Sequence, residues 1–244
     1  TEYAGYLGKF TSNRLALLIY EDGGKLVRTP AYGLHENKQV RNIHGIIDEE
    51  GTLSLQAESV YSAIKQDNIH GMINYLSKEK VREYMNHTLA FPTYTINSFN
   101  YTPVPGSIPS MKESLNISVS NYATVTGKRL FIVPDIMTIS PTKLTNDSVR
   151  KYWIKLDNAF SEIDSVEIIL PEGYIVESIP QPVTLKSRFG NYSSAIQLTG
   201  NKIFYYRSLQ QNEGVYPITA YKELYNFFQS VYLADRGTVV LVKK

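Results

Sequence analysis

Four histidines are the side chains best suited to exchange a proton near neutral pH, and their spacing decides whether they could bind a metal. They are His35, His44, His70 and His87, and an unperturbed histidine has a pKa of about 6.5. None of them forms the His-x-x-x-His pair of a zinc site, and no cysteine completes a ligand set. Asp67 and His70 lie three residues apart on an expected helix and could orient each other, but a structural role accounts for them better. We predict no metal site.

Hydroxyl and carboxyl groups are the next source of catalysis to consider. A hydrolase serine needs a Gly-x-Ser-x-Gly elbow between a strand and a helix, whereas Gly106 and Ser107 lie in a proline-rich stretch. Asp48, Glu49 and Glu50 could form an acid/base pair for glycoside cleavage. They crowd one expected turn, however, so the solvated tip of a hairpin is the better interpretation. We therefore predict no catalytic residue in this chain.

Cofactor chemistry finds no support in the sequence. The absence of cysteine excludes disulfides, thiolate-bound zinc, iron–sulfur clusters and a cysteine nucleophile. Gly5 and Gly8 are not followed by the Gly-Lys-Ser/Thr of a phosphate-binding loop. We predict no cofactor and no cofactor-binding residue.

Tyrosine and net charge bear on the kind of partner. The chain has 19 tyrosines, and tyrosine suits both sugar stacking and protein interfaces because it joins a large apolar ring to a hydroxyl. Most of them alternate with polar residues, as between Ile203 and Arg207, where strand propensity is sufficient to account for them. The formal net charge of +2 is too small to indicate nucleic acid or an anionic membrane surface as the partner.

The elements that must position these residues are mostly strands. Apolar runs around Asp22-Gly23-Gly24 predict a hairpin over residues 15–28, and a second hairpin is expected over residues 40–57. Helical spacing predicts one broken helix or two short ones within residues 66–89, and an amphipathic helix over residues 221–232 with Thr219 as its N-cap. No apolar run approaches the roughly 20 residues of a membrane span.

The stretch between Glu83 and Lys112 is the expected boundary. It has no Asp, Glu, Lys or Arg and contains Pro92, Pro103 and other prolines, so it is either a linker or crossover, or an edge strand, where prolines are tolerated. We predict a mostly β protein of two antiparallel, sandwich-like units with a few helices. Residues 1–110 form a β-rich unit with a helical segment, and residues 111–244 form a C-terminal β-sandwich bearing the amphipathic helix.

A series of motifs resembles a bacterial family of transglutaminase-like envelope proteins. The C-terminal motifs occupy residues 168–177, 189–192, 207, 214–217, 221–228 and 239–243. Their order is similar to an uncharacterised β domain that follows the papain-fold catalytic domain of that family. Residues 5–8, 14–19, 29–30 and 36–37 resemble the segment directly after the catalytic domain.

This resemblance implies an accessory region and not the enzyme itself. The catalytic Cys, His and Asp of the family would lie in sequence upstream of this chain, and none of them can be transferred to it. The resemblance also implies a location in the bacterial cell envelope, either periplasmic or secreted. We expect a non-catalytic module that supports or positions the upstream domain. The alternative is a carbohydrate- or peptide-binding module, with a protein or a glycan as the partner.

Overall fold

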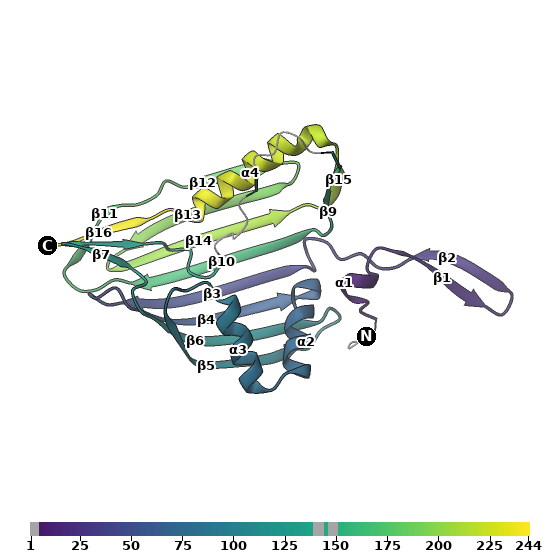
Figure 1. The fold of residues 1–244 in the computed structure, drawn as a ribbon, viewed down its shortest axis with the longest axis horizontal. Helices are drawn as coiled ribbons and strands as arrows, with labels where there is room; N and C mark the ends of the chain where they lie inside the picture. The colour runs from purple at the N-terminus through teal and green to yellow at the C-terminus, as the bar shows by residue number, and fades with distance from the viewer. Residues whose placement is uncertain (1–4, 139–143, 146–150) are drawn as a thin grey trace.

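One large twisted sheet organises the molecule (Figure 1). The structure is a computed structural model that describes residues 5–138, 144–145 and 151–244. The sheet has eight strands in the order β12-β13-β14-β10-β3-β4-β6-β5. All neighbours are antiparallel except β10 and β3, which are parallel. The strands are β3 (Lys38–Ile47), β4 (Leu53–Ser62), β5 (Tyr94–Val104), β6 (Ser110–Val119), β10 (Phe160–Ile169), β12 (Val183–Ser187), β13 (Gly190–Thr199) and β14 (Lys202–Gln211).

A second, smaller sheet packs against one end of the first. Its order is β11-β16-β8-β7, formed by Tyr174–Ser178, Val239–Lys243, Arg129–Ile132 and Thr124–Thr126. The two sheets share a hydrophobic core in which Leu53, Ile117 and Ile168 of the large sheet lie with Leu130 and Leu241 of the small one. Strict alternation of buried and exposed side chains along β4 and β6 places the apolar side chains on this inner face. The expected mostly β, sandwich-like architecture is confirmed.

Helices cover the rest of the inner face. The predicted helical segment is two helices, α2 (Asp67–Tyr75) and α3 (Lys78–Thr88), which add Met72, Val81 and Met85 to the same core. The predicted C-terminal helix is α4 (Tyr221–Ala234), and it packs against β12 to β14 in a second core. Thr219 is not its N-cap, because a short 3-10 turn, η2 (Ile218–Ala220), leads directly into the helix. The remaining short elements are α1 (Gly8–Thr11), η1 (Ala63–Lys65), β9 (Ile154–Leu156) and β15 (Gly214–Tyr216).

The first predicted hairpin is present and projects from the body of the molecule (Figure 1). It consists of β1 (Leu15–Tyr20) and β2 (Gly23–Arg28) in the expected antiparallel register. The second predicted hairpin is β3 and β4, which pair from Gln39 to Ile47. Both follow from apolar strands that flank turns rich in glycine and acidic residues.

The proline-containing stretch is partly an edge strand. Residues Tyr94–Val104 form β5 at the edge of the large sheet, with Pro103 in the strand. The edge-strand alternative is therefore the one that the structure shows for this segment. The division at residues 110 and 111 falls at the start of β6, and strands from both sides of it share the large sheet. The two-unit division stays a prediction.

Candidate interaction surface and buried charge cluster

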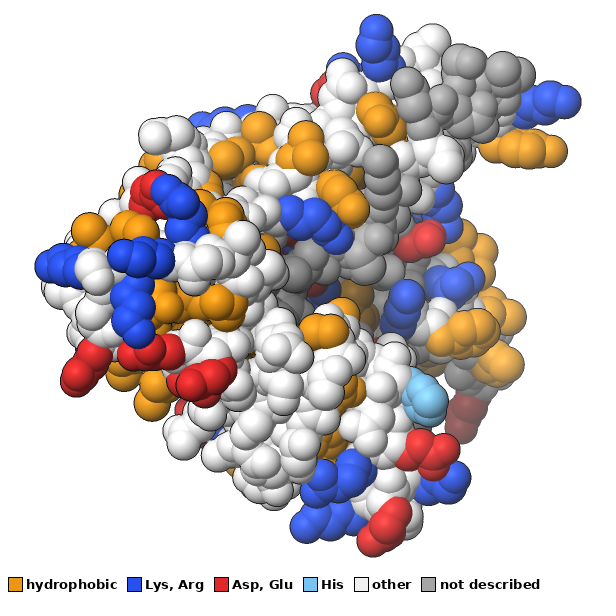
Figure 2. Space-filling view, turned by 60° about the vertical axis from the view of Figure 1, so that its left-hand side comes forward, with side chains coloured by type: hydrophobic (Ala, Val, Ile, Leu, Met, Phe, Trp, Pro, Cys, Tyr) orange, Lys and Arg blue, Asp and Glu red, His pale blue; other side chains and the backbone are white. Residues whose placement is uncertain are grey.

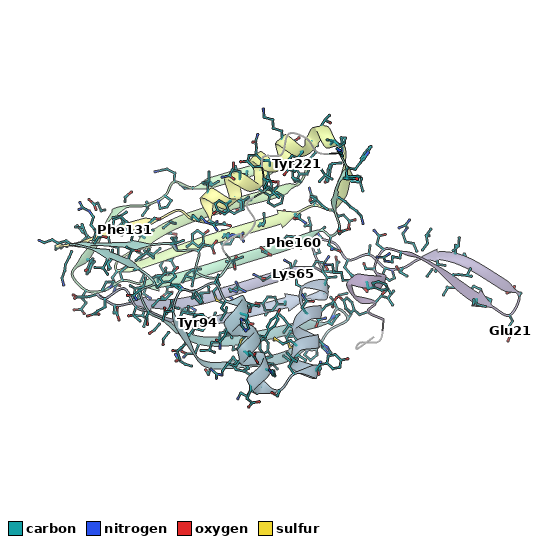
Figure 3. The ribbon with its side chains drawn as sticks, viewed as in Figure 1. Glu21, Lys65, Tyr94, Phe131, Phe160 and Tyr221 are labelled. Carbon is teal, nitrogen blue, oxygen red and sulfur yellow. The ribbon has the colours of Figure 1, made fainter. Side chains whose placement is uncertain are left out.

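The projecting hairpin exposes apolar side chains on both of its faces. Alternation along β1 places Leu15, Leu17 and Ile19 on one face, where Ile19 is 81% exposed, and Leu18 and Tyr20 on the other. Leu26 pairs with Leu17 and extends the first face. The charged Glu21 lies at the tip (Figure 3). An exposed apolar surface of this kind is typical of an interaction site.

The strands of the hairpin have no other strand beside them among the described residues. β1 and β2 pair only with each other in the described part of the chain, so both outer edges keep unpaired backbone groups. Isolated two-stranded hairpins are marginal in water. Free strand edges and two apolar faces together form a surface that a further sheet could cover.

The base of the hairpin is fixed to the body. Tyr6 donates a hydrogen bond to Asp67 Oδ1 at 2.8 Å, and the backbone N–H of Lys9 donates to Asp67 Oδ2 at 3.0 Å. The rings of Tyr6 and Tyr32 contact each other at 4.9 Å between centroids, next to buried Ala63. Burial, together with the neighbouring carboxylate, raises the pKa of Tyr6. Asp67, singled out above as a partner for His70, thus anchors the N-terminal segment.

A buried charge cluster lies on the inner face of the large sheet. Its centre is Arg207 on β14, whose side chain is 1% exposed. Arg207 donates from Nε to Asp235 Oδ1 at 2.9 Å and from Nη2 to Asp235 Oδ2 at 3.2 Å. Its Nη1 contacts Asp164 Oδ2 of β10 at 3.3 Å and Glu162 Oε2 at 3.5 Å. Because Asp235 directly follows α4, the cluster fixes the end of that helix to the sheet.

Asp135 is the fourth carboxylate beside this guanidinium. It lies after β8, and its Oδ2 is 3.4 Å from Arg207 Nε. Burial raises the pKa of Asp135 to about 8; Arg207 opposes this shift, while Asp235 and Asp164 add to it. A carboxylic acid with such a pKa holds its proton at neutral pH.

Arg41 on β3 forms a second arm of the cluster. It donates to Ser59 Oγ at 2.9 Å, to the Tyr61 hydroxyl at 2.8 Å and to Thr138 Oγ1 at 2.6 Å. Thr138 in turn donates to Asp164 Oδ1 at 2.8 Å. Burial raises the pKa of Tyr61 to about 12, against the lowering effect of Arg41.

The cluster follows the register of the sheet. Arg207 is opposite Asp164, Asp164 opposite Arg41, and Arg41 opposite Ser59. Ser59 is opposite Glu113, whose carboxylate accepts hydrogen bonds from Tyr61 and Tyr101. One row of polar residues therefore crosses the otherwise apolar inner face. Within this row Arg207 pairs with Asp164 and Asp164 with Arg41, and loss of one partner from such a buried pair destabilises a fold.

Lys65 closes the edge of this cluster. Its Nζ is 2.6 Å from Glu162 Oε1 and lies over the ring of Phe160 at 3.8 Å from the centroid. Figure 3 labels Lys65, at the end of η1, and Phe160, at the start of β10. Burial is the largest single effect on the pKa of Glu162 and raises it. The ion pair with Lys65, together with the charges of Arg207 and Arg41, outweighs burial and lowers this pKa below its ordinary value.

The histidines singled out from the sequence are not brought together. His35 and His87 are exposed in separate elements, and His44 on β3 lies 3.8 Å from the Glu167 carboxylate on the outer face. His70 on α2 is within 2.9 Å of the Asn74 amide. In residues 5–138, 144–145 and 151–244, no group of three His, Asp or Glu side chains is arranged to hold a metal ion.

The acidic turn and the proline-flanked serine have local roles. Asp48 Oδ1 accepts a hydrogen bond from the N–H of Thr52 at 2.7 Å, and Glu49 pairs with Lys243. These contacts confirm the hairpin-tip interpretation of the acidic run. Ser107 is exposed in the bend between β5 and β6.

The tyrosines divide between the inner and outer faces of the large sheet. Tyr205 is buried on the inner face, Tyr225 on α4 is half-buried, and Tyr206 is 45% exposed on the outer face. There, Phe204 and Tyr206 line a shallow groove of about 420 Å³ together with Asn42 and Gln197. In this groove the exposed Tyr206 lies beside the amide side chains of Asn42 and Gln197.

Surface charge is mixed on the visible face. Figure 2 shows Lys and Arg side chains next to Asp and Glu side chains, interspersed with hydrophobic ones. Within the described part of the chain, no helix is long and apolar enough to cross a membrane.

Sequence reasoning missed Asp135 and Asp235 but had a signal for two other members of the cluster. Arg207 shares the alternation phase of the buried Ile203 and Tyr205. Asp164 likewise shares the phase of Val166 and Ile168. A charge in the apolar phase of a strand indicates a buried, paired group.

Comparison with known proteins gives one partial family match. Residues 128–241 match the model of a domain of unknown function, DUF3858, for which a structure has been solved. This match lies within the predicted C-terminal unit. No curated protein matches the chain.

A solved structure shows limited similarity. The crystal structure described as a "putative protease" from Parabacteroides distasonis ATCC 8503 aligns with 48% of this chain at 15% sequence identity and a TM-score of 0.42. The alignment covers 24% of that protein, so this chain spans about a quarter of its length. A similarity of this size carries no conclusion about activity.

Proposed function

We propose that this chain is a non-catalytic interaction module that supports or positions a transglutaminase-like domain of the same bacterial envelope protein. The observation that carries the proposal is the hairpin of β1 and β2, which has apolar side chains on both faces and two edges that pair with no other strand in the described part of the chain. Strands with apolar side chains on both faces are typical of sheets covered on both sides. The partner is named by the resemblance of residues 5–8 and 14–19 to the segment that directly follows the catalytic domain.

The chemistry of the chain agrees with a supporting role. Arg207 binds Asp164 and Asp235, and Arg41 binds Ser59, so the two arginines hold elements together. The nucleophile expected of the family is a cysteine, and this chain contains none. In this proposal the catalytic residues belong to the upstream domain, and the hairpin adds strands to its sheet.

Association of two separate polypeptides tests the proposal. The upstream region of the gene and this chain are produced separately, and their Kd is measured by calorimetry. We expect Ile19→Glu to weaken binding at least tenfold, because it places a charge on the apolar face of the hairpin. Ile46→Glu is the matched control, since Ile46 is also an exposed isoleucine in a strand, on the outer face of the large sheet.

Two results would contradict this proposal. One is a gene that encodes no transglutaminase-like domain upstream of this chain. The other is an Ile19→Glu variant that binds the upstream polypeptide as tightly as the Ile46→Glu control does. The envelope location is tested separately, by fractionating cells that express the full-length protein.

A carbohydrate-binding role is the second candidate, and the outer-face groove favours it. Phe204 and Tyr206 lie two residues apart on one strand and therefore present their rings on the same face. Asn42 and Gln197 supply amide donors and acceptors beside them. Exposed aromatic rings next to amides suit the apolar and hydroxyl faces of a sugar.

Glycan titration tests this second candidate. If sugars bind in the groove, Tyr206→Ala abolishes the heat of binding of an oligosaccharide identified on a glycan array. Tyr75→Ala is the control, because Tyr75 is 80% exposed on α2 and distant in sequence from the groove. An array without a bound glycan, or equal binding by both variants, removes the support for this role.

A further inference from the structure

A cavity of about 510 Å³ opens between the end of α4 and the inner face of the large sheet. The cavity lies where α4 ends, just before the chain enters β16 of the small sheet. The walls are mostly apolar and come from both layers, with Pro134, Pro180, Val183, Leu185, Ile196 and Leu233 among the lining residues. Pockets of this size and character bind small molecules in many proteins.

Two buried polar atoms in the cavity lining have no hydrogen-bond partner among the residues that the structure describes. They are Asp135 Oδ2 and the Tyr205 hydroxyl, in side chains of residues that are 2% and 5% exposed. Arg207 Nε lies 3.4 Å from Asp135 Oδ2 but directs its hydrogen bond to Asp235. The hydroxyl of Tyr192 donates to Asp235 Oδ1 as well. Because unsatisfied buried polar groups are costly, both atoms indicate a place for polar atoms of a ligand.

The ionised form of Asp135 has no cation of its own among the described residues. Four carboxylates, those of Asp135, Asp164, Asp235 and Glu162, lie within 3.5 Å of Arg207. Arg41 contributes a second cation to Asp164, at 3.9 Å, and Lys65 contributes one to Glu162. Asp235 receives two hydrogen bonds from Arg207. Among the described residues, three cations thus face four acids when all four are ionised, and Asp135 is the acid without a hydrogen-bonded cation.

We propose that the cavity binds a small ligand that carries an ammonium group on an apolar body, with the ammonium group between Asp135 and Tyr205. An ammonium group has three donors, so it can donate to Asp135 Oδ2 and to the Tyr205 hydroxyl oxygen at the same time. It also supplies a cation for the ionised form of Asp135. The apolar body lies against the walls formed by α4, β12 and β13. This site is independent of the hairpin and of the proposed function.

Binding of an ammonium group is expected to depend on pH. Among the described residues, the charged or titratable groups that face Asp135 are Arg207, Asp164, Asp235, Tyr205 and Tyr122. Burial raises the pKa of Asp135 to about 8, and the acid holds its proton at neutral pH. The ammonium group must displace this proton, so its affinity rises about tenfold per pH unit up to about pH 8. A neutral ligand that accepts a hydrogen bond from the protonated acid shows the opposite dependence.

Titration with cyclohexylmethylamine tests the proposal, and cyclohexylmethanol serves as its neutral isostere. Calorimetry on the full chain is expected to show amine binding that tightens from about pH 6 to about pH 8. Asp135→Asn is expected to abolish this binding, and Tyr205→Phe to weaken it several-fold. Tyr206→Phe is the matched control, since it removes the same hydroxyl from the next residue of the strand, on the opposite face.

The outcomes separate the possible occupants. Failure of the amine to bind overturns the proposal, as does an alcohol that binds equally well and is unaffected by Asp135→Asn. Affinity that falls with rising pH assigns a neutral acceptor instead and likewise overturns it. If Asp135→Asn does not fold, Tyr205→Phe and the pH dependence of the unmodified chain decide. None of these results depends on association with an upstream domain, so the two proposals fail separately.

Discussion

Arg207 binds carboxylates that come from three separate segments of the chain. Its contacts with Asp164, Asp135 and Asp235 join β10, the segment after β8 and the end of α4. Removing the guanidinium leaves these acids buried without their shared cation. We therefore expect Arg207→Met to lower the free energy of unfolding by about 3–5 kcal/mol, measured by urea denaturation.

An exposed arginine provides the control for this prediction. Arg129 forms a two-point contact with Glu177, at 2.6 and 2.8 Å, but both side chains face solvent. Arg129→Met should cost less than about 1 kcal/mol. Equal losses for the two variants would show that the buried cluster does not stabilise the fold in the way its geometry indicates.

The pKa of Asp135 makes stability depend on pH. The folded protein keeps this proton up to about pH 8, whereas an unfolded aspartate loses it near pH 4. The stabilising contribution of the protonated acid is therefore complete below about pH 4 and is lost as the pH rises toward 8, at up to about 1.4 kcal/mol per unit. The pKa of Glu162 is lowered, so its contribution to stability is lost only as the pH falls below the ordinary glutamate range. It therefore does not offset the loss that Asp135 causes as the pH rises.

Replacement by asparagine isolates this effect. Asp135→Asn keeps the shape of the neutral acid and cannot ionise, so its stability relative to the parent should increase steadily from about pH 5 to about pH 8. Urea denaturation at several pH values measures the difference. If the difference in the free energy of unfolding is independent of pH, Asp135 has the ordinary aspartate pKa in the folded protein and the prediction is wrong.

At the scale of elements, the turn between β12 and β13 depends on Gly190. Its φ is +155°, and a Cβ atom there would lie 1.9 Å from the carbonyl oxygen of Gln210 on the neighbouring β14. Gly190→Ala must displace backbone, so we expect a loss of about 2–3 kcal/mol in the free energy of unfolding. Circular dichroism during urea unfolding measures it.

Replacing a glycine in a helix is expected to raise the free energy of unfolding instead of lowering it. Gly71 lies within α2, and a Cβ atom there would have no neighbour within 4 Å. Gly71→Ala should therefore stabilise the chain by up to about 1 kcal/mol. Loss of stability in this variant, or none in Gly190→Ala, would contradict the backbone argument.

Local spacing was sufficient to predict most of the individual elements. The hairpin of β1 and β2 has its turn at the expected glycines, and the apolar stripe of Tyr221, Leu224 and Val231 gave α4. Each of these signals is local, because the residues that form it lie within a short stretch of the sequence. The N-cap of α4 was not predictable in this way, because the 3-10 turn before it packs buried Ala220 into the second core.

The pairing of β3 with β10 could not be read from the sequence. These strands are parallel and distant along the chain, so nothing local specifies their register. Asp135 was missed for a related reason, because it lies in a loop and is buried only when α4 and β10 reach it. The sequence predicts no site residue, because the cluster of Arg207 arises only from the tertiary arrangement.

At the scale of the whole molecule, one parallel seam joins two antiparallel halves of the large sheet. The strands β12, β13, β14 and β10 lie on one side, and β3, β4, β6 and β5 lie on the other. The row from Arg207 through Asp164 to Arg41 crosses this seam with paired charges. The seam therefore combines backbone pairing with buried ion pairs, and both halves share the apolar core beneath the small sheet.

This architecture predicts a gradient of protection from hydrogen exchange. Amides of β3 and β10 lie between strands on both sides and should exchange only on global unfolding. In the isolated chain, amides of β1 and β2 should exchange far faster, because the hairpin pairs with no other described strand. Mass spectrometry of peptides spanning the hairpin measures this difference. Addition of the upstream polypeptide should then slow exchange in the hairpin and leave exchange in β3 and β10 unchanged. If the hairpin of the isolated chain is already as protected as β10, its exposed faces need no partner.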